Sequence, residues 1–193
     1  MSDRQQSLPT GREAAYSSIG EFPLAYEMQD HRYSFEIDAT PEELWRKFFA
    51  PKSRGDVIQH RGVRIEILHP GDERGEGLVR HCHFPVPWYL ISGGRAMSWE
   101  WITEVKPCES WRYDGVGKPL WSKATGWTRL EQLDGGHTRV HFRETYHVFN
   151  PILRVLFERA VHRFISKDND VLIKESLEHG LELMRAHETS EAG

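Results

Sequence analysis

Two shortages in this sequence each remove a class of protein. It has only two cysteines, Cys82 and Cys108, too few for a disulfide framework, so we expect free thiols and a cytoplasmic location. It has no apolar run long enough to span a bilayer, and residues 1–6 are polar where a signal peptide would lead into an apolar segment. We therefore expect no transmembrane segment.

Positive charge is scarce as well. Lys and Arg number 25 against 29 Asp and Glu, so the net charge is −4 with His neutral. A nucleic-acid-binding domain typically carries a basic excess or stripe, so we do not expect nucleic acid as a partner. No glycine-rich phosphate loop joins a predicted strand to a helix, because residues 115–117 lack that setting. The sequence therefore predicts no cofactor.

Aromatic residues, in contrast, are abundant, with seven Trp, nine Phe and six Tyr. For any single one of them the ordinary explanation is packing in a core. Several nevertheless fall on neighbouring predicted strands, and aromatic side chains also wall cavities that hold large apolar ligands. Both interpretations stay open.

Alternating apolar and polar residues predict a series of strands. The pattern begins at residues 31–38, and Thr40 and Pro41 then begin a short helix as its cap and first-turn proline. Further strands are expected at 63–67, 78–84, 97–105, 110–115, 121–132 and 138–148. Residues 134–136, Asp-Gly-Gly, predict a hairpin turn between the last two.

The C-terminal segment has the apolar spacing of a long helix that begins at Asn150 and Pro151. Its apolar residues form two stripes, Leu153, Phe157, Ala160 and Phe164, then Ile173, Leu177, Gly180 and Met184. At about 100° per residue these stripes point in nearly opposite directions. We therefore predict a bend or break between Lys167 and Asp170.

A run of strands followed by a long helix is typical of the α+β class, with an antiparallel sheet and helices on one face. The length suits one domain with a core. We expect an N-terminal tail over 1–30, one ligand-binding domain over 31–187 and a C-terminal tail over 188–193.

The order of several segments resembles the START/Bet v1-like (SRPBCC) helix-grip superfamily, the polyketide cyclase/dehydrase and lipid-transport-like group. These segments are residues 37–45, 102–107, 127–131, 134–140 and the closing helix from Asn150. The resemblance implies a curved antiparallel sheet wrapped around the long C-terminal helix, with an internal apolar cavity. It implies binding of a hydrophobic small molecule such as a lipid, isoprenoid or polyketide. It carries over no catalytic residue.

One carboxylate is placed unusually. Alternation puts Glu144 between Phe142 and Tyr146 on the apolar face of the last strand, where a charge needs a partner or takes up a proton. Arg80 has a similar place between Leu78 and Cys82, so we predict that Glu144 meets either Arg80 or a polar group of a ligand. Three roles stay open for Glu144: a structural ion pair, a contact to a polar ligand group, and acid/base catalysis.

The expected ligand-binding residues are mostly inward or aromatic positions of the predicted strands and helix. They are Tyr33, Phe35, Arg80, Trp99, Trp101, Trp111, Tyr113, Thr128, Phe142, Glu144, Tyr146, Ile173 and Leu177. His81 and His83 have a zinc-compatible spacing, but nothing completes a recognisable ligand set, so we predict no metal site. Small residues on the 121–132 strand leave volume for a ligand or allow close packing under the helix.

Residues 85–95 contain two prolines, an apolar stretch and a Gly-Gly pair. We predict that they form a mobile lid over the cavity, and the alternative is a loop packed on the domain surface.

The first hypothesis for function is a carrier or sensor of an apolar small molecule. The others are a cyclase or dehydratase with Glu144 as its acid/base, and a co-chaperone-like interaction module. Whether the protein is an enzyme, contacts membranes transiently or forms oligomers is left open.

Overall fold

The computed structural model describes residues 29–49, 52–60, 62–88, 93–118 and 120–191. Its strands are β1 (Gln29–Ile37), β2 (Val57–His60), β3 (Val63–Pro70), β4 (Leu78–Pro85), β5 (Arg95–Lys106), β6 (Ser110–Lys118), β7 (Ser122–Gln132) and β8 (Thr138–Val148). The helical elements are α2 (Pro41–Phe48), α3 (Pro151–Leu153), the π-helical turn η3 (Arg154–Glu158), α4 (Arg159–Glu191) and the 3-10 turn η2 (Asp134–Gly136).

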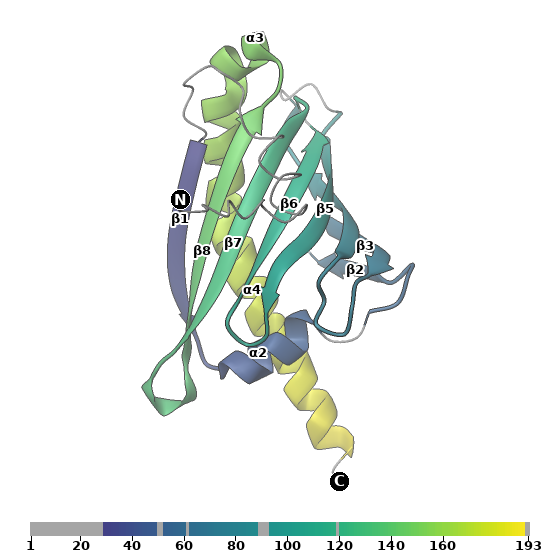
Figure 1. Ribbon diagram of the computed structural model, residues 1–193, viewed down its shortest axis with the longest axis vertical. Coiled ribbons are helices and arrows are strands. Elements are labelled where there is room, and N and C mark those ends of the chain that lie inside the picture. Colours follow the sequence, from purple (N-terminus) through teal and green to yellow (C-terminus); the bar gives the residue numbers. More distant parts are fainter. Residues whose placement is uncertain (1–28, 50–51, 61, 89–92, 119, 192–193) are drawn as a thin grey trace, which may run out of the picture.

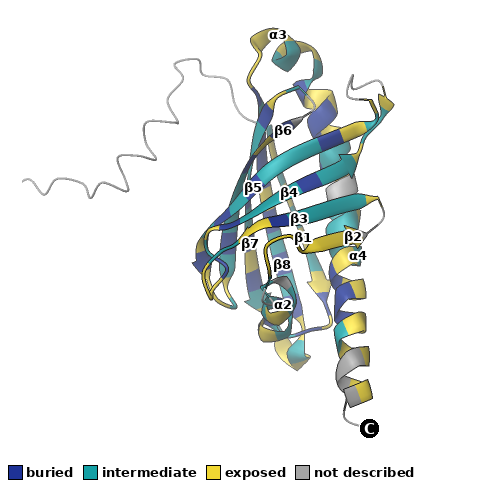
Figure 2. Cartoon of the chain, turned by 90° about the vertical axis from the view of Figure 1, so that its right-hand side faces the viewer, coloured by how far each residue is buried: buried dark blue, intermediate teal, exposed yellow. Residues whose placement is uncertain are grey.

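All eight strands form one antiparallel sheet in the order β1-β8-β7-β6-β5-β4-β3-β2. Every strand predicted from alternation is present, and β2 at the sheet edge is the addition. The sheet is a meander except that β1 pairs with β8 at the other end of the chain. Figures 1 and 2 show the sheet curving around α4, which runs along its concave side, so the α+β helix-grip fold is confirmed.

Local chemistry accounts for the turns that shape the sheet. Thr40 Oγ1 accepts the Glu43 N–H at 3.3 Å, and the Glu43 carboxylate accepts the Thr40 N–H at 2.9 Å, a reciprocal cap that begins α2 as predicted. Gly135 and Gly136 have φ of 78° and 84°, a left-handed backbone that favours glycine, and they make the β7–β8 hairpin.

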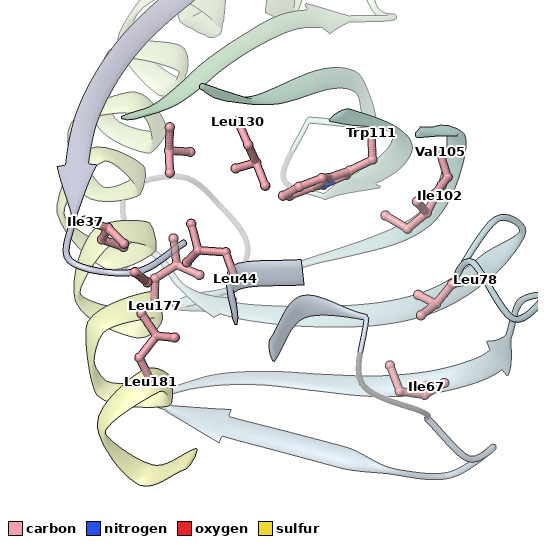
Figure 3. Packing of buried hydrophobic residues seen from close by; sticks show 12 residues of the cluster. Ile37, Leu44, Ile67, Leu78, Ile102, Val105, Trp111, Leu130, Leu177 and Leu181 are labelled. Carbon is pink, nitrogen blue, oxygen red and sulfur yellow. The ribbon is translucent and has the colours of Figure 1, made fainter. Parts of the chain in front are cut away.

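Inward residues of the sheet and α4 build the larger of two apolar clusters. Figure 3 shows Trp111 and Leu130 of the sheet lying with Leu177 of α4 and Leu44 of α2 in this cluster. Leu44 is fully buried, so the short helix closes the lower end of the grip. A smaller cluster of Tyr146, Val148 and Val161 lies at the opposite end.

The break predicted between Lys167 and Asp170 is wrong, because α4 is continuous from Arg159 to Glu191. The buried side of this helical segment begins with polar residues, Glu158 at the end of η3 and His162 and Ser166 of α4, beside the buried Val161, and continues in line through Leu177. The first apolar stripe of the sequence does not face the core there, since Ala160 is exposed. The irregular turn η3 comes earlier.

Two elements extend past the predicted domain limits, which stay a prediction. β1 begins at Gln29, two residues inside the predicted N-terminal tail, whose residues 1–28 lie outside the described part of the chain. α4 continues to Glu191, past the predicted boundary at 187. Among the described residues, no helix is long and apolar enough to cross a bilayer.

Candidate ligand-binding site

Glu144 faces the interior from β8, as alternation predicts, and only 4% of it is exposed. Phe142 and Tyr146 flank it on the same face and are buried too. Burial raises the pKa of Glu144 to about 7, although a hydrogen bond from Tyr113 opposes the rise. A carboxyl group that titrates near neutral pH can either donate or accept a proton.

The partner of Glu144 is Tyr113, whose hydroxyl donates to Glu144 Oε2. Tyr113 lies on β6 and Glu144 on β8, and between them Gly126 of β7 is the register partner of both. A Cβ at Gly126 would overlap the Tyr113 ring, so the ring lies across this glycine to reach the carboxylate. At this position close packing, rather than free volume, explains the small residue.

Arg80 does not pair with Glu144, which corrects the predicted ion pair. Its guanidinium binds Glu100 of the adjacent strand β5, with Nε 2.8 Å and Nη2 2.7 Å from Oε2. Ser98 Oγ donates to the other Glu100 oxygen at 2.6 Å. Burial alone would lower the pKa of Arg80, but the Glu100 carboxylate outweighs it and raises that pKa.

The two pairs meet at Tyr113. The Arg80 Cζ lies 6.0 Å from the centroid of the Tyr113 ring, whose hydroxyl is bound to Glu144. Burial raises the pKa of Tyr113 well above its usual value, and the neighbouring Glu144 charge adds to the rise. Tyr113 therefore stays a hydrogen-bond donor.

A third polar pair joins the edge of the sheet to α4. His31 is opposite Glu144 in the β1–β8 register, and its Nε2 lies 2.7 Å from Asp170 Oδ1. The His31 ring contacts Tyr33 with centroids 5.5 Å apart. Burial raises the pKa of Tyr33, and the charges of Asp170 and Glu144 raise it further, so the phenol keeps its proton.

Two buried polar residues of α4 extend this group. His162 Nε2 and Ser166 Oγ lie 3.4 Å apart, and the His162 ring is 6.2 Å from that of His31. Burial lowers the pKa of His162, and His31 lowers it further, so His162 is neutral at pH 7. Its ring also stacks on Tyr146 at 5.9 Å.

These side chains form a polar belt across the inner face of the grip. The belt consists of His31, Tyr33, Arg80, Glu100, Tyr113, Glu144, His162, Ser166 and Asp170. Along β8 the belt residue Glu144 lies between Val140 of the larger apolar cluster and Val148 of the smaller one. Hydrogen-bonding groups between apolar walls suit a mostly apolar molecule with a polar group.

Most of the predicted ligand-binding residues lie on the inner side. Tyr33, Arg80, Tyr113 and Glu144 are in the belt, and Phe35, Trp111, Thr128, Phe142, Tyr146, Ile173 and Leu177 lie on the inner face of the sheet or the buried side of α4. The structure brings Phe35, Trp111, Ile173 and Leu177 together in the larger apolar cluster.

The prediction that Trp99 and Trp101 line a ligand cavity is corrected, because both lie on the outer face of β5. Trp99 is the register partner of outward His81 and stacks on it with centroids 4.6 Å apart. Alternation then turns Glu100 inward, opposite Arg80. The inward residue of this stretch is therefore Glu100, the carboxylate between the two tryptophans.

The sequence reasoning missed five belt residues. They are His31, Glu100, His162, Ser166 and Asp170. Alternation could have found His31, which shares a face with Tyr33, and Glu100, which shares one with Ile102. No signal of this kind marks the polar stripe of α4, because buried polar residues look like a solvent-facing stripe.

Two other predictions concern the outer surface. His81 and His83 have ring centroids 4.3 Å apart on the outer face, and in the described part of the chain no three His, Cys, Asp or Glu side chains could hold a metal ion. In the predicted lid, Trp88 is 83% exposed, and residues 89–92 lie outside the described residues. Gating by this loop stays a prediction.

Solved structures share the fold at low sequence identity. The Zhui aromatase/cyclase from Streptomyces sp. R1128 matches with a TM-score of 0.62 at 14% identity, covering 81% of this chain and 94% of that one. A Thermus thermophilus protein matches with a TM-score of 0.57 at 18% identity, covering 81% of this chain and 99% of that one. A conserved protein from Geobacillus kaustophilus matches with a TM-score of 0.55 at 17% identity, covering 82% of this chain and 96% of that one.

Sequence comparison gives the family. Among curated protein sequences, none is similar enough to this chain to count as a match. The family described as "Polyketide cyclase / dehydrase and lipid transport" matches residues 28–179, which contain all eight strands and the greater part of α4. The chain therefore belongs to the polyketide cyclase/dehydrase and lipid transport family.

Proposed function

We propose that the protein binds an apolar small molecule that carries a hydroxyl or carbonyl group, between the sheet and α4. The polar belt carries this proposal, because buried ionisable groups there lie between two apolar clusters. A fold that needed only stability would gain little from a fully buried carboxyl group with a raised pKa. Family membership supports the same ligand class.

Glu144 and Tyr113 would receive the polar group of this ligand. Near pH 7 the Glu144 carboxyl is close to half-protonated, so it can donate to a carbonyl or accept from a hydroxyl. The Tyr113 hydroxyl, held by the close approach at Gly126, donates to Glu144, and its oxygen can accept a hydrogen bond from a ligand hydroxyl. The pair formed by His31 and Asp170 is the edge of the belt beside α4.

A second candidate function is acid/base chemistry on the same molecule. The observation that favours it is the pKa of about 7 for Glu144, which suits a general acid or base at neutral pH. As a carboxylate it could take a proton from carbon beside a carbonyl, and as an acid it could protonate a departing hydroxyl to release water. The aromatase/cyclase with this fold supports a cyclisation or dehydration.

Binding of a naphthol and of its methyl ether, measured by calorimetry, tests the proposal. We expect the naphthol to bind more tightly to the wild-type protein, and Tyr113→Phe and Glu144→Gln to reduce that preference about tenfold. Trp99→Phe, on the outer face, is the matched aromatic control and should keep it. Equal affinities for both probes in all proteins would contradict a polar contact by the belt.

Native mass spectrometry of the purified protein identifies a retained ligand and separates the two functions. If Glu144→Gln retains that molecule but no longer converts it, acid/base catalysis is supported. If wild-type protein and variant both release it unchanged, the carrier or sensor role is supported. A co-purifying polypeptide in place of a small molecule would overturn both.

A further inference from the structure

Apolar side chains are exposed at the end of the molecule where β4, β6 and β8 finish. We name this group the apolar tip: Trp88, Trp121, Phe149, Ile152, Val155 and Leu156. Trp88 is 83% exposed and Val155 is 77% exposed. Figure 2 shows α3 at this end, opposite α2. Monomeric proteins rarely leave such a patch uncovered without a function.

The tip is built by three chain connections that the fold holds together. The Phe149 N–H donates to the Trp121 carbonyl at 3.0 Å, which ties the end of β8 to the β6–β7 turn. Val86, from the β4–β5 connection, and Leu153, from α3, both pack against the smaller apolar cluster beneath the tip. Residues 151, 152, 155 and 156 also line an open hollow of about 360 Å³.

The connections that form the tip carry charges of a single sign, and Asp30 of the neighbouring strand β1, opposite Thr145, is paired with Arg143 and Arg32. Residues 86–95, 116–123 and 145–157 contain no Asp or Glu, although the whole chain is acidic with a net charge of −4. They contain four basic residues, Arg95, Lys118, Lys123 and Arg154, of which Arg154 is only 15% exposed and donates to the carbonyls of Val148 and Phe149.

The first turns of α4 add three exposed basic residues, Arg159, Arg163 and Lys167. We name these three, together with Arg95 and Lys123, the basic collar. The acidic residue among them, Glu158, is fully buried and accepts the Val148 N–H at 2.7 Å. Every exposed charge from residue 151 to 167 is therefore positive.

We propose that the apolar tip docks on the surface of a bilayer that contains anionic lipids. Tryptophan is favoured at the membrane interface, aliphatic side chains enter the acyl region, and each basic residue near an anionic surface strengthens binding about fivefold. A protein partner of ordinary composition would present charges of both signs, whereas a collar of one sign fits an extended anionic surface. The inference does not depend on the ligand proposed for the interior.

Co-sedimentation with vesicles tests the docking. With equal parts of phosphatidylcholine and phosphatidylglycerol we expect binding that weakens as salt rises, and with phosphatidylcholine alone much weaker binding. Leu156→Glu should reduce binding to the mixed vesicles at least about tenfold. Leu183→Glu is the matched control, because Leu183 is an exposed leucine of α4, 56% exposed, far from the tip. It should bind like the wild type.

Quenching by brominated lipid adds a depth measurement. Trp121→Phe should remove part of the quenching, while Trp99→Phe should leave it unchanged, because Trp99 stacks on His81 on the outer face of the sheet. Equal binding by Leu156→Glu and Leu183→Glu would overturn the proposal, as would no binding to mixed vesicles. A dimer in solution that Leu156→Glu dissociates would also overturn it, since the tip would then be covered by a second copy.

Discussion

The absence of a side chain at Gly126 leaves the space in which the Tyr113 ring lies. The substitution Gly126→Ala tests this. A methyl group there would overlap the ring and move the hydroxyl away from Glu144. We expect a loss of about 1–3 kcal/mol in the free energy of unfolding, from overpacking and the lost hydrogen bond. Because that bond lowers the pKa of Glu144, the pKa should rise above about 7, as measured by carboxyl carbon NMR.

Tyr113→Phe is the control for this substitution. It removes the hydroxyl and leaves the ring in place, so it should raise the pKa of Glu144 with a smaller loss of stability. If Gly126→Ala changes stability and leaves the Glu144 titration unaltered, the glycine only permits packing and does not position the hydroxyl.

The raised pKa of Glu144 predicts a pH dependence of stability. Between its ordinary value of 4.5 and about 7, the folded protein holds a proton that the unfolded chain releases, so this residue makes stability fall as pH rises through that window. Glu144→Gln imitates the protonated form. It should be more stable than the wild type above pH 7, by up to about 3 kcal/mol, and equal to it in acid.

Urea unfolding at a series of pH values measures this difference. Glu73→Gln, in an exposed turn, is the matched substitution and should alter stability little at any pH. A wild type that remains as stable as Glu144→Gln above pH 7 would show that Glu144 is ionised in the fold without cost.

Sequence reasoning could identify Glu144 as an inward carboxylate but not its partner. Alternation fixes the face of one strand, so the inward position followed from Phe142 and Tyr146. The choice of partner depends on which strands are neighbours and in which register. Arg80 and Glu144 have three strands between them, while Tyr113 crosses a single glycine.

Among the secondary-structure elements, the end of β8 and the start of α4 are joined by Glu158. Its Oε2 accepts the Val148 N–H at 2.7 Å, and the side chain is fully buried. Glu158→Ala should lower the free energy of unfolding by about 2–4 kcal/mol, because it leaves a buried N–H unpaired and a void. Hydrogen exchange at the Val148 amide should accelerate as well. Glu158→Gln keeps an acceptor oxygen, and an equal effect of both variants would exclude this role.

The contact between β1 and α4 through His31 and Asp170 is suited to a double-mutant cycle. Their side chains are 23% and 37% exposed, so we expect a coupling of about 0.5–1 kcal/mol rather than the larger value of a buried pair. His31→Phe keeps the ring against Tyr33 and removes the nitrogens, and Asp170→Asn removes the charge. Additive effects in urea unfolding would mean that the 2.7 Å contact contributes nothing.

In the long helix, prediction from hydrophobic spacing failed at the residues that belong to the polar belt. Hydrophobic spacing assumes that buried means apolar, and it therefore took Ala160 and Phe164 as the inner stripe. Buried there are Glu158, His162 and Ser166, in line with Leu177, and beside them the apolar Val161. The capped helix α2 and the Asp-Gly-Gly turn were predicted correctly because their signals come from backbone chemistry within a few residues.

At the scale of the whole molecule, element order was enough to predict the wrapped sheet and its helix, but not the apolar tip. Ile152, Val155 and Leu156 look like core residues in the sequence, and only the fold shows that they face outward. The basic collar was hidden in the same way, because the net charge of −4 averages over the whole chain. Distribution in space, unlike composition, depends on which connections meet at one end.

The topology also predicts an order of folding. β1 must pair with β8, across contacts such as Glu36 with Arg139 that are separated by 103 positions, whereas β3 to β8 form by successive hairpins. Closing such a long loop is slow, so we expect amides of β1 to gain protection after those of β5 to β7. Pulsed hydrogen exchange during refolding measures this, and simultaneous protection of all strands would contradict it.

The pairing of β1 with β8 has a consequence during synthesis. While the ribosome is still making residues 138–148, β1 has no neighbour, and α4, which covers the concave side, has not yet emerged. The inner face of the growing hairpins is then open to water. If the protein binds the apolar ligand proposed above, that ligand would have open access to Tyr113 at this stage, before the last strand and the helix fold over the inner face. Newly made protein would then bind the ligand more quickly than folded protein exchanges it.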